Sequence, residues 1–491
     1  MRVLKNFIGG EWRDSTGARV KDLNPADVQD VVADAPASTA AEAAAACDAA
    51  ARAFEGWRQT PAPVRGQILF KVQRRMEERR QELAEALTRE EGKTIAESRG
   101  EIQRAINVVE FFAGEARRIT GETIPSELAN NFCYTLKQPV GPVAVITPWN
   151  FPIAIPIWKI APALVSGNTV VFKPASLTPL TAALIVEIFD ECGLPGGVLN
   201  LVFGGGRDVG DTIVRHPAIL AVSFTGSNDV GVGLYGAAAA RGIKCQCEMG
   251  GKNPIVVLGD ADLELAVEST LQGAFGSTGQ RCTATSRAVV VESIANEFVE
   301  RLEARTASLV VGNGLNPATN VGPSVDERQL ETVLSYVDTG RYEGARLVRG
   351  GERMRSEGLD RGYFVAPAIF DHVDANMRIA QEEIFGPVLS LIRVPDSPSA
   401  LSVANNVRFG LSASVYTNDV ASMFRFIDRL DAGIVHVNSP TVGGEAHIPF
   451  GGMKATGVGL REMGRVAIDF YTELKVVYID YTGGVRKTNL Y

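Results

Sequence analysis

Cys282 is the residue of this chain best suited to covalent chemistry. It lies in the polar, glycine-containing run Gly279-Gln280-Arg281-Cys282-Thr283, and a cysteine thiolate attacks carbonyl carbons. Glu248 precedes a second glycine turn, Met249-Gly250-Gly251-Lys252, where a carboxylate would activate water. A nucleophilic thiol followed by a hydrolytic base is the logic of thioester chemistry. The alternatives are a buried structural thiol, which the polar neighbours of Cys282 disfavour, and a solvated turn carboxylate at Glu248.

The patterns around these two residues predict the elements that position them. Short apolar runs predict strands over 143–147, 169–173, 198–203, 221–225 and 243–248. Helical patterns lie between them over 179–191, 206–215 and 228–241, and before them over 40–56, 62–92 and 95–118. Strands that alternate with helices imply right-handed crossovers and a parallel sheet. Such a sheet binds ligands at the carboxyl ends of its strands.

A second alternating region follows residue 251. Strand patterns cover 254–258, 288–291, 388–394, 412–417 and 433–438, and helical patterns cover 262–275 and 294–310. The fold class is therefore α/β with parallel sheets, and a length of 491 residues suggests two or three domains. Residues 475–480 resemble an edge strand, and 481–491 resemble an extension whose ordering needs a partner surface.

The composition excludes several classes of protein. Hydrophobic residues make up 45% and charged residues 22%, with a net charge of −8, so no basic stripe for nucleic acid is expected. Neither a secretory signal nor a run of about 20 apolar residues for a membrane helix is seen. Six scattered cysteines indicate a reducing cytoplasm, and four histidines without ligand spacing predict no metal site. Cys245 and Cys247 share one face of a strand, as packing residues or, less simply, as redox partners.

One motif is misleading. Gly231-Val232-Gly233-Leu234-Tyr235-Gly236 matches the dinucleotide fingerprint literally. The turn after the strand at 221–225 comes earlier, however, at Gly226-Ser227-Asn228-Asp229. The three glycines are therefore expected inside a helix, where small residues permit close packing.

Seven segments, in order, carry a resemblance to a known family. They are Pro148-Trp149-Asn150-Phe151-Pro152, Lys173-Pro174-Ala175, Phe224-Thr225-Gly226-Ser227, Glu248-Met249-Gly250-Gly251-Lys252, Gly279-Gln280-Arg281-Cys282, Glu382-Glu383-Ile384-Phe385-Gly386-Pro387 and Pro449-Phe450-Gly451-Gly452. Together they resemble the aldehyde dehydrogenase superfamily over essentially the whole chain. The resemblance implies two Rossmann-like domains with a small β arm for oligomerisation.

The resemblance also implies the roles of the reacting groups. Cys282 would attack the aldehyde, Asn150 and the backbone N–H of the nucleophile would hold the oxyanion, and Glu248 would activate water. Lys173 would hold the adenosine ribose and counts among the catalytic candidates. A nicotinamide cofactor would lie in a groove formed by Ile146, Trp149, Lys173, Ser176, Gly206, Gly226, Ser227, Gly231, Glu383 and Phe385. The alternatives are a turn-forming Asn, surface charges, core aromatic residues and a helix cap.

Ser176 bears on which nicotinamide cofactor is used. Many NAD-specific members carry Glu three positions after the lysine, where it would repel a 2′-phosphate, and this chain has Ser176. Without that charge the repulsion is relieved. We therefore expect NADP to be tolerated alongside NAD, with a possible preference for NADP.

Two arginines bear on the substrate. Arg281 precedes the nucleophile, and Arg104 lies on the helix that lines the substrate tunnel in this family. A guanidinium near a dry tunnel suits a substrate carboxylate. The alternatives are a salt bridge for Arg104 and a subunit contact for Arg281. The aromatic wall of the tunnel would consist of Phe151, Trp158 and Phe450. The segments 151–159 and 281–287, together with Arg104, look most like those of the α-ketoglutarate semialdehyde (2,5-dioxovalerate) dehydrogenases.

Domains, partners and rival functions follow from the same resemblance. We expect an NAD(P)-binding domain in 1–117 and 140–250, a catalytic domain in 251–450, and oligomerisation segments in 118–139 and 464–491. A homodimer or homotetramer is implied. The rivals are another aldehyde such as succinic semialdehyde or an aromatic aldehyde, acylation of coenzyme A in place of hydrolysis, and a non-catalytic binding protein that retains the fold.

Overall fold

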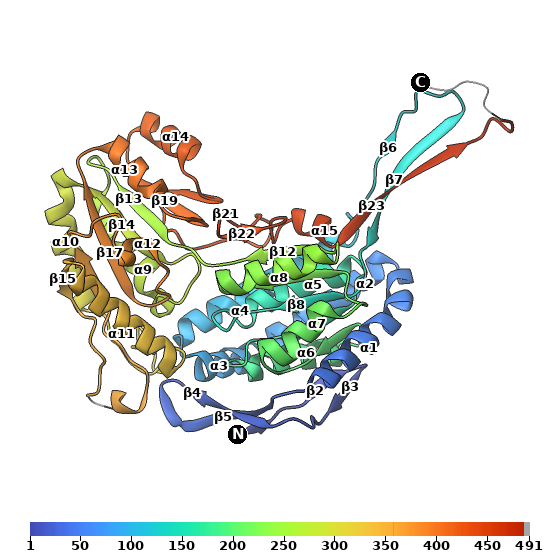
Figure 1. Ribbon diagram of the computed structural model, residues 1–491, viewed down its shortest axis with the longest axis horizontal. Coiled ribbons are helices and arrows are strands. Elements are labelled where there is room, and N and C mark those ends of the chain that lie inside the picture. Colours follow the sequence, from blue (N-terminus) through green and yellow to red (C-terminus); the bar gives the residue numbers. More distant parts are fainter. Residues whose placement is uncertain (357, 486–491) are drawn as a thin grey trace.

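The computed structural model describes residues 1–356 and 358–485 of the chain. Two large sheets, each covered by helices, form the body, and a thin three-stranded arm extends away from it (Figure 1). The last six residues of the predicted extension at 481–491 lie outside the described part. Every helix of the described part is too short or too polar to cross a membrane.

The first sheet has the strand order β22-β12-β11-β8-β9-β10-β2-β3. Its five central strands are parallel, as predicted, with the bounds β8 Val143–Ile146, β9 Val170–Lys173, β10 Leu199–Leu201, β11 Ala221–Thr225 and β12 Lys244–Glu248. The edges are antiparallel: β2 Asn6–Ile8, β3 Glu11–Arg13 and β22 Gly457–Val458. The order of the strands reverses between β8 and β11, and open sheets of this kind bind ligands at that point.

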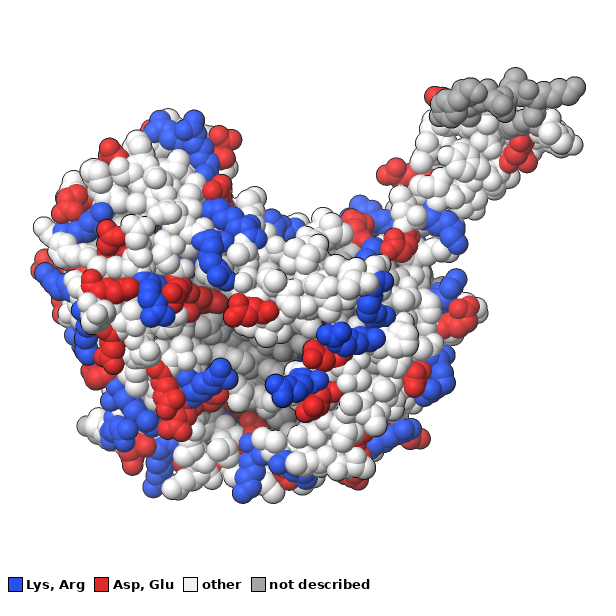
Figure 2. Space-filling view, in the orientation of Figure 1, with Lys and Arg blue, Asp and Glu red and all other residues white. Residues whose placement is uncertain are grey.

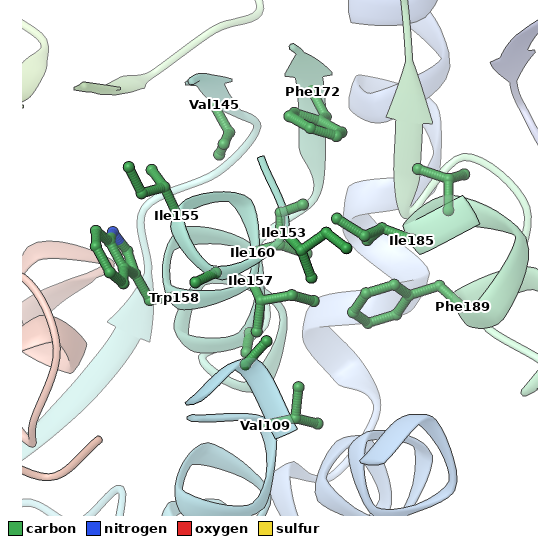
Figure 3. Packing of buried hydrophobic residues seen from close by; sticks show 14 of the residues in the cluster. Val109, Val145, Ile153, Ile155, Ile157, Trp158, Ile160, Phe172, Ile185 and Phe189 are labelled. Atoms are coloured by element: carbon green, nitrogen blue, oxygen red, sulfur yellow. The ribbon is translucent and has the colours of Figure 1, made fainter. Parts of the chain in front are cut away.

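The alternation of side chains divides the core of this sheet between two faces. Val143, Val145 and Phe172 pack with the helices α4 (Ile95–Glu115), α5 (Ala154–Val165) and α6 (Pro179–Glu191). Figure 3 shows this face, with Ile157 of α5 and Phe189 of α6 pointing toward one another and Trp158 on the other side of α5. The opposite face packs against α1 (Ala40–Gln59), α7 (Asp211–Arg215) and α8 (Asn228–Ala240).

The predicted helices differ from the observed ones mainly at their ends. Residues 62–92 form two helices, α2 (Ala62–Glu78) and α3 (Arg80–Glu91), because the backbone of Arg79 leaves the helical conformation. The predicted helix at 206–215 is a π-helical turn, Gly206–Gly210, followed by α7. The interpretation of the glycine motif is confirmed, since α8 begins at Asn228 and includes all three glycines.

The second sheet has the order β15-β16-β17-β14-β13-β19-β20. Only β15 is antiparallel to its neighbour. The strands are β13 Asn253–Val257, β14 Thr285–Val291, β15 Arg346–Arg349, β16 Ala368–Asp371, β17 Val388–Val394, β19 Ser412–Tyr416 and β20 Ile434–Val437. The accompanying helices are α9 Leu263–Phe275, α10 Glu292–Ala307, α11 Glu327–Tyr342, α12 Arg378–Gln381, α13 Ser397–Asn405, α14 Val420–Arg429 and the 3-10 turns Gly276–Gly279 and Leu359–Arg361.

The arm joins two segments that are far apart in sequence. β23 (Thr472–Asp480) pairs antiparallel with β7 (Asn131–Pro139) over its whole length, and β7 pairs with β6 (Thr123–Ile124). The predicted edge strand at 475–480 is thereby confirmed. The remaining elements are β1 Arg2–Val3, β4 Arg19–Asn24, β5 Asp27–Pro36, β18 Phe409–Gly410, β21 Met453–Lys454 and α15 Val466–Phe470.

Candidate active site

A cavity of about 840 Å³ lies where the strand order of the first sheet reverses. It is bounded by α7, α8 and α11, and Figure 2 shows the surface hollowed there, with charged side chains along its edge. Most of the predicted cofactor residues line it together with Asn150 and Cys282: Ile146, Trp149, Lys173, Gly206, Gly226, Ser227, Glu383 and Phe385. Residues from both sheets therefore meet in one cavity.

Two predicted cofactor residues lie outside this lining. Ser176 is exposed after β9, and its hydroxyl donates a hydrogen bond to the Gly204 carbonyl at 3.4 Å. Gly231 is buried inside α8, where a Cβ atom would come within 2.5 Å of the Met249 sulfur. Gly231 therefore allows close packing of α8, and its neighbours Val230 and Gly233 line the cavity instead.

The loop that carries Cys282 has an unusual backbone. Ser277 and Thr278 adopt positive φ angles of 48° and 57°, a region that residues with a side chain seldom occupy. Asn253 holds the loop from the second sheet, because its side-chain amide donates to the carbonyl of Cys282 at 2.8 Å and to that of Ala284 at 2.9 Å. These contacts fix the position of the nucleophile relative to β13.

The thiol of Cys282 is half-buried. Its pKa is raised to about 12, mainly by removal of the thiol from bulk water and also by the nearby groups of Glu383 and Glu248, whereas the Arg104 guanidinium acts in the opposite direction. The thiol is therefore protonated at neutral pH in the protein alone, and reaction requires that a proton leave it.

Asn150 lies beside the nucleophile loop, as an oxyanion donor must. It follows β8, is buried, and its side-chain amide donates a hydrogen bond of 3.1 Å to the carbonyl of Gln280. A side-chain amide carries two N–H groups, so the second remains for an oxygen bound near the thiol. The structure thus brings together Asn150 and Cys282 from different sheets.

Glu248 ends β12, and its carboxylate is buried beside the loop at 451–457. A Cβ atom on Gly451 would come within 2.4 Å of its Oε1, and one on Gly457 within 3.3 Å. Burial raises the pKa of Glu248 well above its usual range, and the neighbouring charge of Glu462 adds to the effect. Its surroundings therefore favour the protonated form of Glu248, which would have to lose its proton before it acts as a base.

A buried ion pair behind Glu248 was not predicted. Lys159 and Glu462 are both fully buried and form an ion pair, and the Lys159 ammonium also donates to the Ser223 hydroxyl at 3.0 Å. One signal was available in the sequence, because Lys159 is the sole charged residue of the apolar stretch 153–165. A buried lysine needs a partner, but nothing local identifies Glu462.

Glu383 and the aromatic pair lie at the nicotinamide end of the predicted groove. Glu383 accepts a hydrogen bond of 2.9 Å from the Gly251 N–H, and burial raises its pKa to about 7. The rings of Trp149 and Phe385 lie 5.4 Å apart, edge to face. Burial also lowers the pKa of Lys173 to about 8, and its ammonium donates a hydrogen bond of 3.0 Å to the Pro174 carbonyl at the end of β9.

A second cavity of about 620 Å³ is lined by Arg104, Phe111 and the loop at 444–447. The Arg104 guanidinium lies 5.1 Å from the ring of Trp158, which itself lies 5.4 Å from that of Phe450. These three predicted substrate residues therefore lie in a row, and of the three it is Arg104 that lines the cavity. Phe151 lies near Arg281, 6.0 Å from its guanidinium.

The two arginines differ in their partners. Arg281 donates to Glu97 at 3.1 Å and to the Ser277 hydroxyl at 2.8 Å, so its charge is balanced within the chain. Among the described residues, Arg104 forms no ion pair, and its buried Nε lacks a hydrogen-bond partner. Burial lowers the pKa of Arg104. The guanidinium of Arg104, which is half-buried and has no ion pair within the described part, is able to pair with a carboxylate.

Comparison with known proteins decides the family. The sequence model that describes the Aldehyde dehydrogenase family matches residues 12–477 of this chain. The chain belongs to this family. A curated family member named alpha-ketoglutaric semialdehyde dehydrogenase, from Bacillus subtilis, is 49% identical over 96% of this chain and 97% of its own length. A 2,5-dioxopentanoate dehydrogenase from Saccharolobus solfataricus is 43% identical over 97% and 99%.

The solved structures agree on the fold. A betaine aldehyde dehydrogenase from Staphylococcus aureus, solved in complex with NAD+, superposes with a TM-score of 0.95 at 35% identity, over 98% of this chain and 95% of that one. The aldehyde dehydrogenase fold predicted from the sequence is confirmed. Within the described residues, no cluster of three or more His, Cys, Asp or Glu side chains has the arrangement of a metal site.

The pKa of Cys282 makes its alkylation by iodoacetamide strongly dependent on pH. Because the thiolate is the nucleophile, we expect the labelling rate at Cys282 in the protein alone to rise about tenfold per pH unit between pH 7 and 10. Mass spectrometry of the peptide that contains Cys282 measures this rate. A rate that levels off near pH 8 would contradict the raised pKa.

Proposed function

We propose that this aldehyde dehydrogenase uses NAD(P) to oxidise a carboxylate-bearing semialdehyde to the acid, with α-ketoglutarate semialdehyde the favoured substrate. The observation that carries the proposal is Arg104, which lines the second cavity beside Trp158, has a buried Nε without a hydrogen-bond partner, and forms no ion pair among the described residues. The names of the most similar relatives support the same substrate.

The residues present fit a dinucleotide cofactor. Helix α8 begins directly after Ser227 at the cavity, and helix N-termini bind phosphate. Lys173 and Glu383 each lack a charged partner in their hydrogen bonds, which go to backbone groups, so both remain available to ribose hydroxyls. When bound, the oxidised nicotinamide supplies the acceptor for a hydride.

The chemistry of the protein's own residues follows from their placement. The Cys282 sulfur adds to the aldehyde carbon, and the oxygen, which becomes negatively charged, is held by Asn150 and the N–H of Cys282. A nicotinamide held in the groove would accept the hydride of that carbon, and the adduct on Cys282 would then be a thioester. Glu248 removes a proton from water, which attacks the thioester and releases the acid and the free thiol.

Hydrolysis is preferred over acylation of coenzyme A because Glu248 is present. A protein that passes its acyl group to coenzyme A has no need of a base for water. Relatives with other names exist, among them malonate-semialdehyde dehydrogenase 1 of Geobacillus thermodenitrificans, 41% identical over 97% of this chain and 98% of its own length. The acceptor and the aldehyde therefore both need a direct test.

Initial rates over a panel of aldehydes, with each nicotinamide cofactor and with or without coenzyme A, test the proposed function. We expect α-ketoglutarate semialdehyde to give the highest kcat/KM without coenzyme A, and Cys282→Ala to abolish turnover while cofactor binding is retained. If the wild-type protein binds cofactor tightly but oxidises no aldehyde, it is a binding protein that retains the fold.

The role of Arg104 is tested by comparing substrates of different charge. Arg104→Met should raise KM for a carboxylated semialdehyde about 10- to 100-fold, the loss expected for a charge-assisted hydrogen bond, and leave an uncharged aldehyde of the same length nearly unaffected. Arg281→Met is the matched control, because Arg281 is already paired with Glu97. Equal effects of the two variants on the carboxylated substrate would refute the anchor.

We infer that NADP is accepted because the position that would repel a 2′-phosphate is occupied by the exposed Ser176. Ser176→Glu should lower kcat/KM for NADP by about tenfold, since a like charge is placed at short range, and should change NAD little. Ser176→Gln adds a similar volume without charge and serves as the control. An unchanged ratio of NADP to NAD would exclude this role.

We further propose that the arm binds a second copy of the chain. Its strand β23 exposes Leu474, Val476 and Tyr478 by 62%, 50% and 71%, and an exposed apolar strand of this kind marks an interface. Val476→Asp with Tyr478→Asp should give monomers by sedimentation velocity. Lys21→Asp on β4 makes the same net change of charge away from the arm and should leave the oligomer intact. A wild-type monomer would dismiss the proposal.

A further inference from the structure

Lys93 precedes α4 and is buried against the turn that carries Asn150. Its ammonium donates to the Asn150 carbonyl at 2.6 Å and to Oε2 of Glu101 at 2.6 Å, and it lies 3.9 Å from the centre of the Phe151 ring. Glu91 is 3.9 Å away. Both Lys93 and Glu101 are almost completely buried, with exposures of 1% and 3%.

Glu101 holds the next part of the same turn. Its Oε1 accepts hydrogen bonds of 2.9 Å from the Ile153 N–H and 3.0 Å from the Ala154 N–H. These N–H groups begin α5, and the N-cap residue Ile153 provides no side-chain hydrogen bond for them. A carboxylate at a helix N-terminus is stabilised by the unpaired N–H groups and the helix dipole.

A buried ion pair is weak evidence of a stabilising role, because apolar residues of similar volume are often as stable. Here every remaining hydrogen bond of the pair goes to the backbone between Asn150 and Ala154. The backbone of Lys93 is in turn enclosed by the second half of the molecule, since a Cβ atom on Gly314 would come within 2.3 Å of its carbonyl oxygen. The pair thus connects the turn of Asn150 to the half that carries Cys282.

We propose that Lys93 and Glu101 are positioning residues for the oxyanion donor Asn150. They fix the backbone from the Asn150 carbonyl to the start of α5 so that the Asn150 amide faces the nucleophile loop before substrate arrives. This inference rests on the proposed function only in so far as both use the Cys282 thiol and Asn150.

The test uses acylation by an activated ester, p-nitrophenyl acetate, which develops an oxyanion on the Cys282 adduct but requires neither cofactor nor aldehyde. Lys93→Met, Glu101→Gln and the double variant are compared with Arg99→Met, an exposed α4 cation outside the site. We expect each of the first three to slow acylation about 10- to 100-fold, somewhat less than removal of an oxyanion donor itself, and Arg99→Met to leave it unchanged. The double variant removes both buried charges together and so keeps the test available if a single variant fails to fold.

Two further readouts separate positioning from general damage. Alkylation of Cys282 by iodoacetamide forms no oxyanion, so its rate should not change in any of these variants. In an Asn150→Ala background Lys93→Met should cause no further loss, because both act through the same amide. Multiplicative losses in that background, slower alkylation, or a double variant with the wild-type acylation rate would each overturn the proposal. Ester turnover without aldehyde oxidation by the wild type would count against the proposed function alone.

Discussion

Asn150 and Cys282 come from different sheets, and the chemistry of this protein depends on holding their two loops in contact. The hydrogen bond from the Asn150 amide to the Gln280 carbonyl joins them directly. Neither loop is a regular element, so each needs support from outside itself. Asn253 supports the nucleophile loop from β13, and the pair Lys93 and Glu101 supports the turn after β8.

Helix α4 contacts three neighbouring segments along one stripe. Glu97 closes the N-terminal capping box of the helix with Thr94 and also accepts a hydrogen bond from Arg281. One turn later Glu101 holds the start of α5, and Arg104 reaches the ring of Trp158. Residues three and four apart lie on one face of a helix, so a single rigid element contacts the nucleophile loop and the turn after Asn150 and bears the proposed substrate anchor.

Burial sets the resting protonation of the reacting groups. Burial raises the pKa of the Cys282 thiol and of the Glu248 carboxyl group, and it therefore favours the protonated form of each in the protein alone. Each must lose a proton at a different step, the thiol before attack and the carboxylate before hydrolysis. The buried ion pair of Lys159 and Glu462 lies near Glu248 and places two further charges of opposite sign in the same interior.

The sequence by itself determined the candidates for the reacting residues and the order of most strands and helices, because a polar glycine loop, an apolar run or a helical period is a local pattern. It misplaced element ends such as the break at Arg79. It also missed the strands β2 and β3, because each has three residues and is too short to show an alternating pattern. Only the tertiary structure decided which of the two predicted substrate arginines, Arg104 or Arg281, is held in an ion pair, since Arg281 and its partner Glu97 lie far apart in the chain. It alone assigned Lys93 and Glu101 to the turn of Asn150, because the partner of a buried charge is chosen by three-dimensional packing and not by its neighbours in sequence.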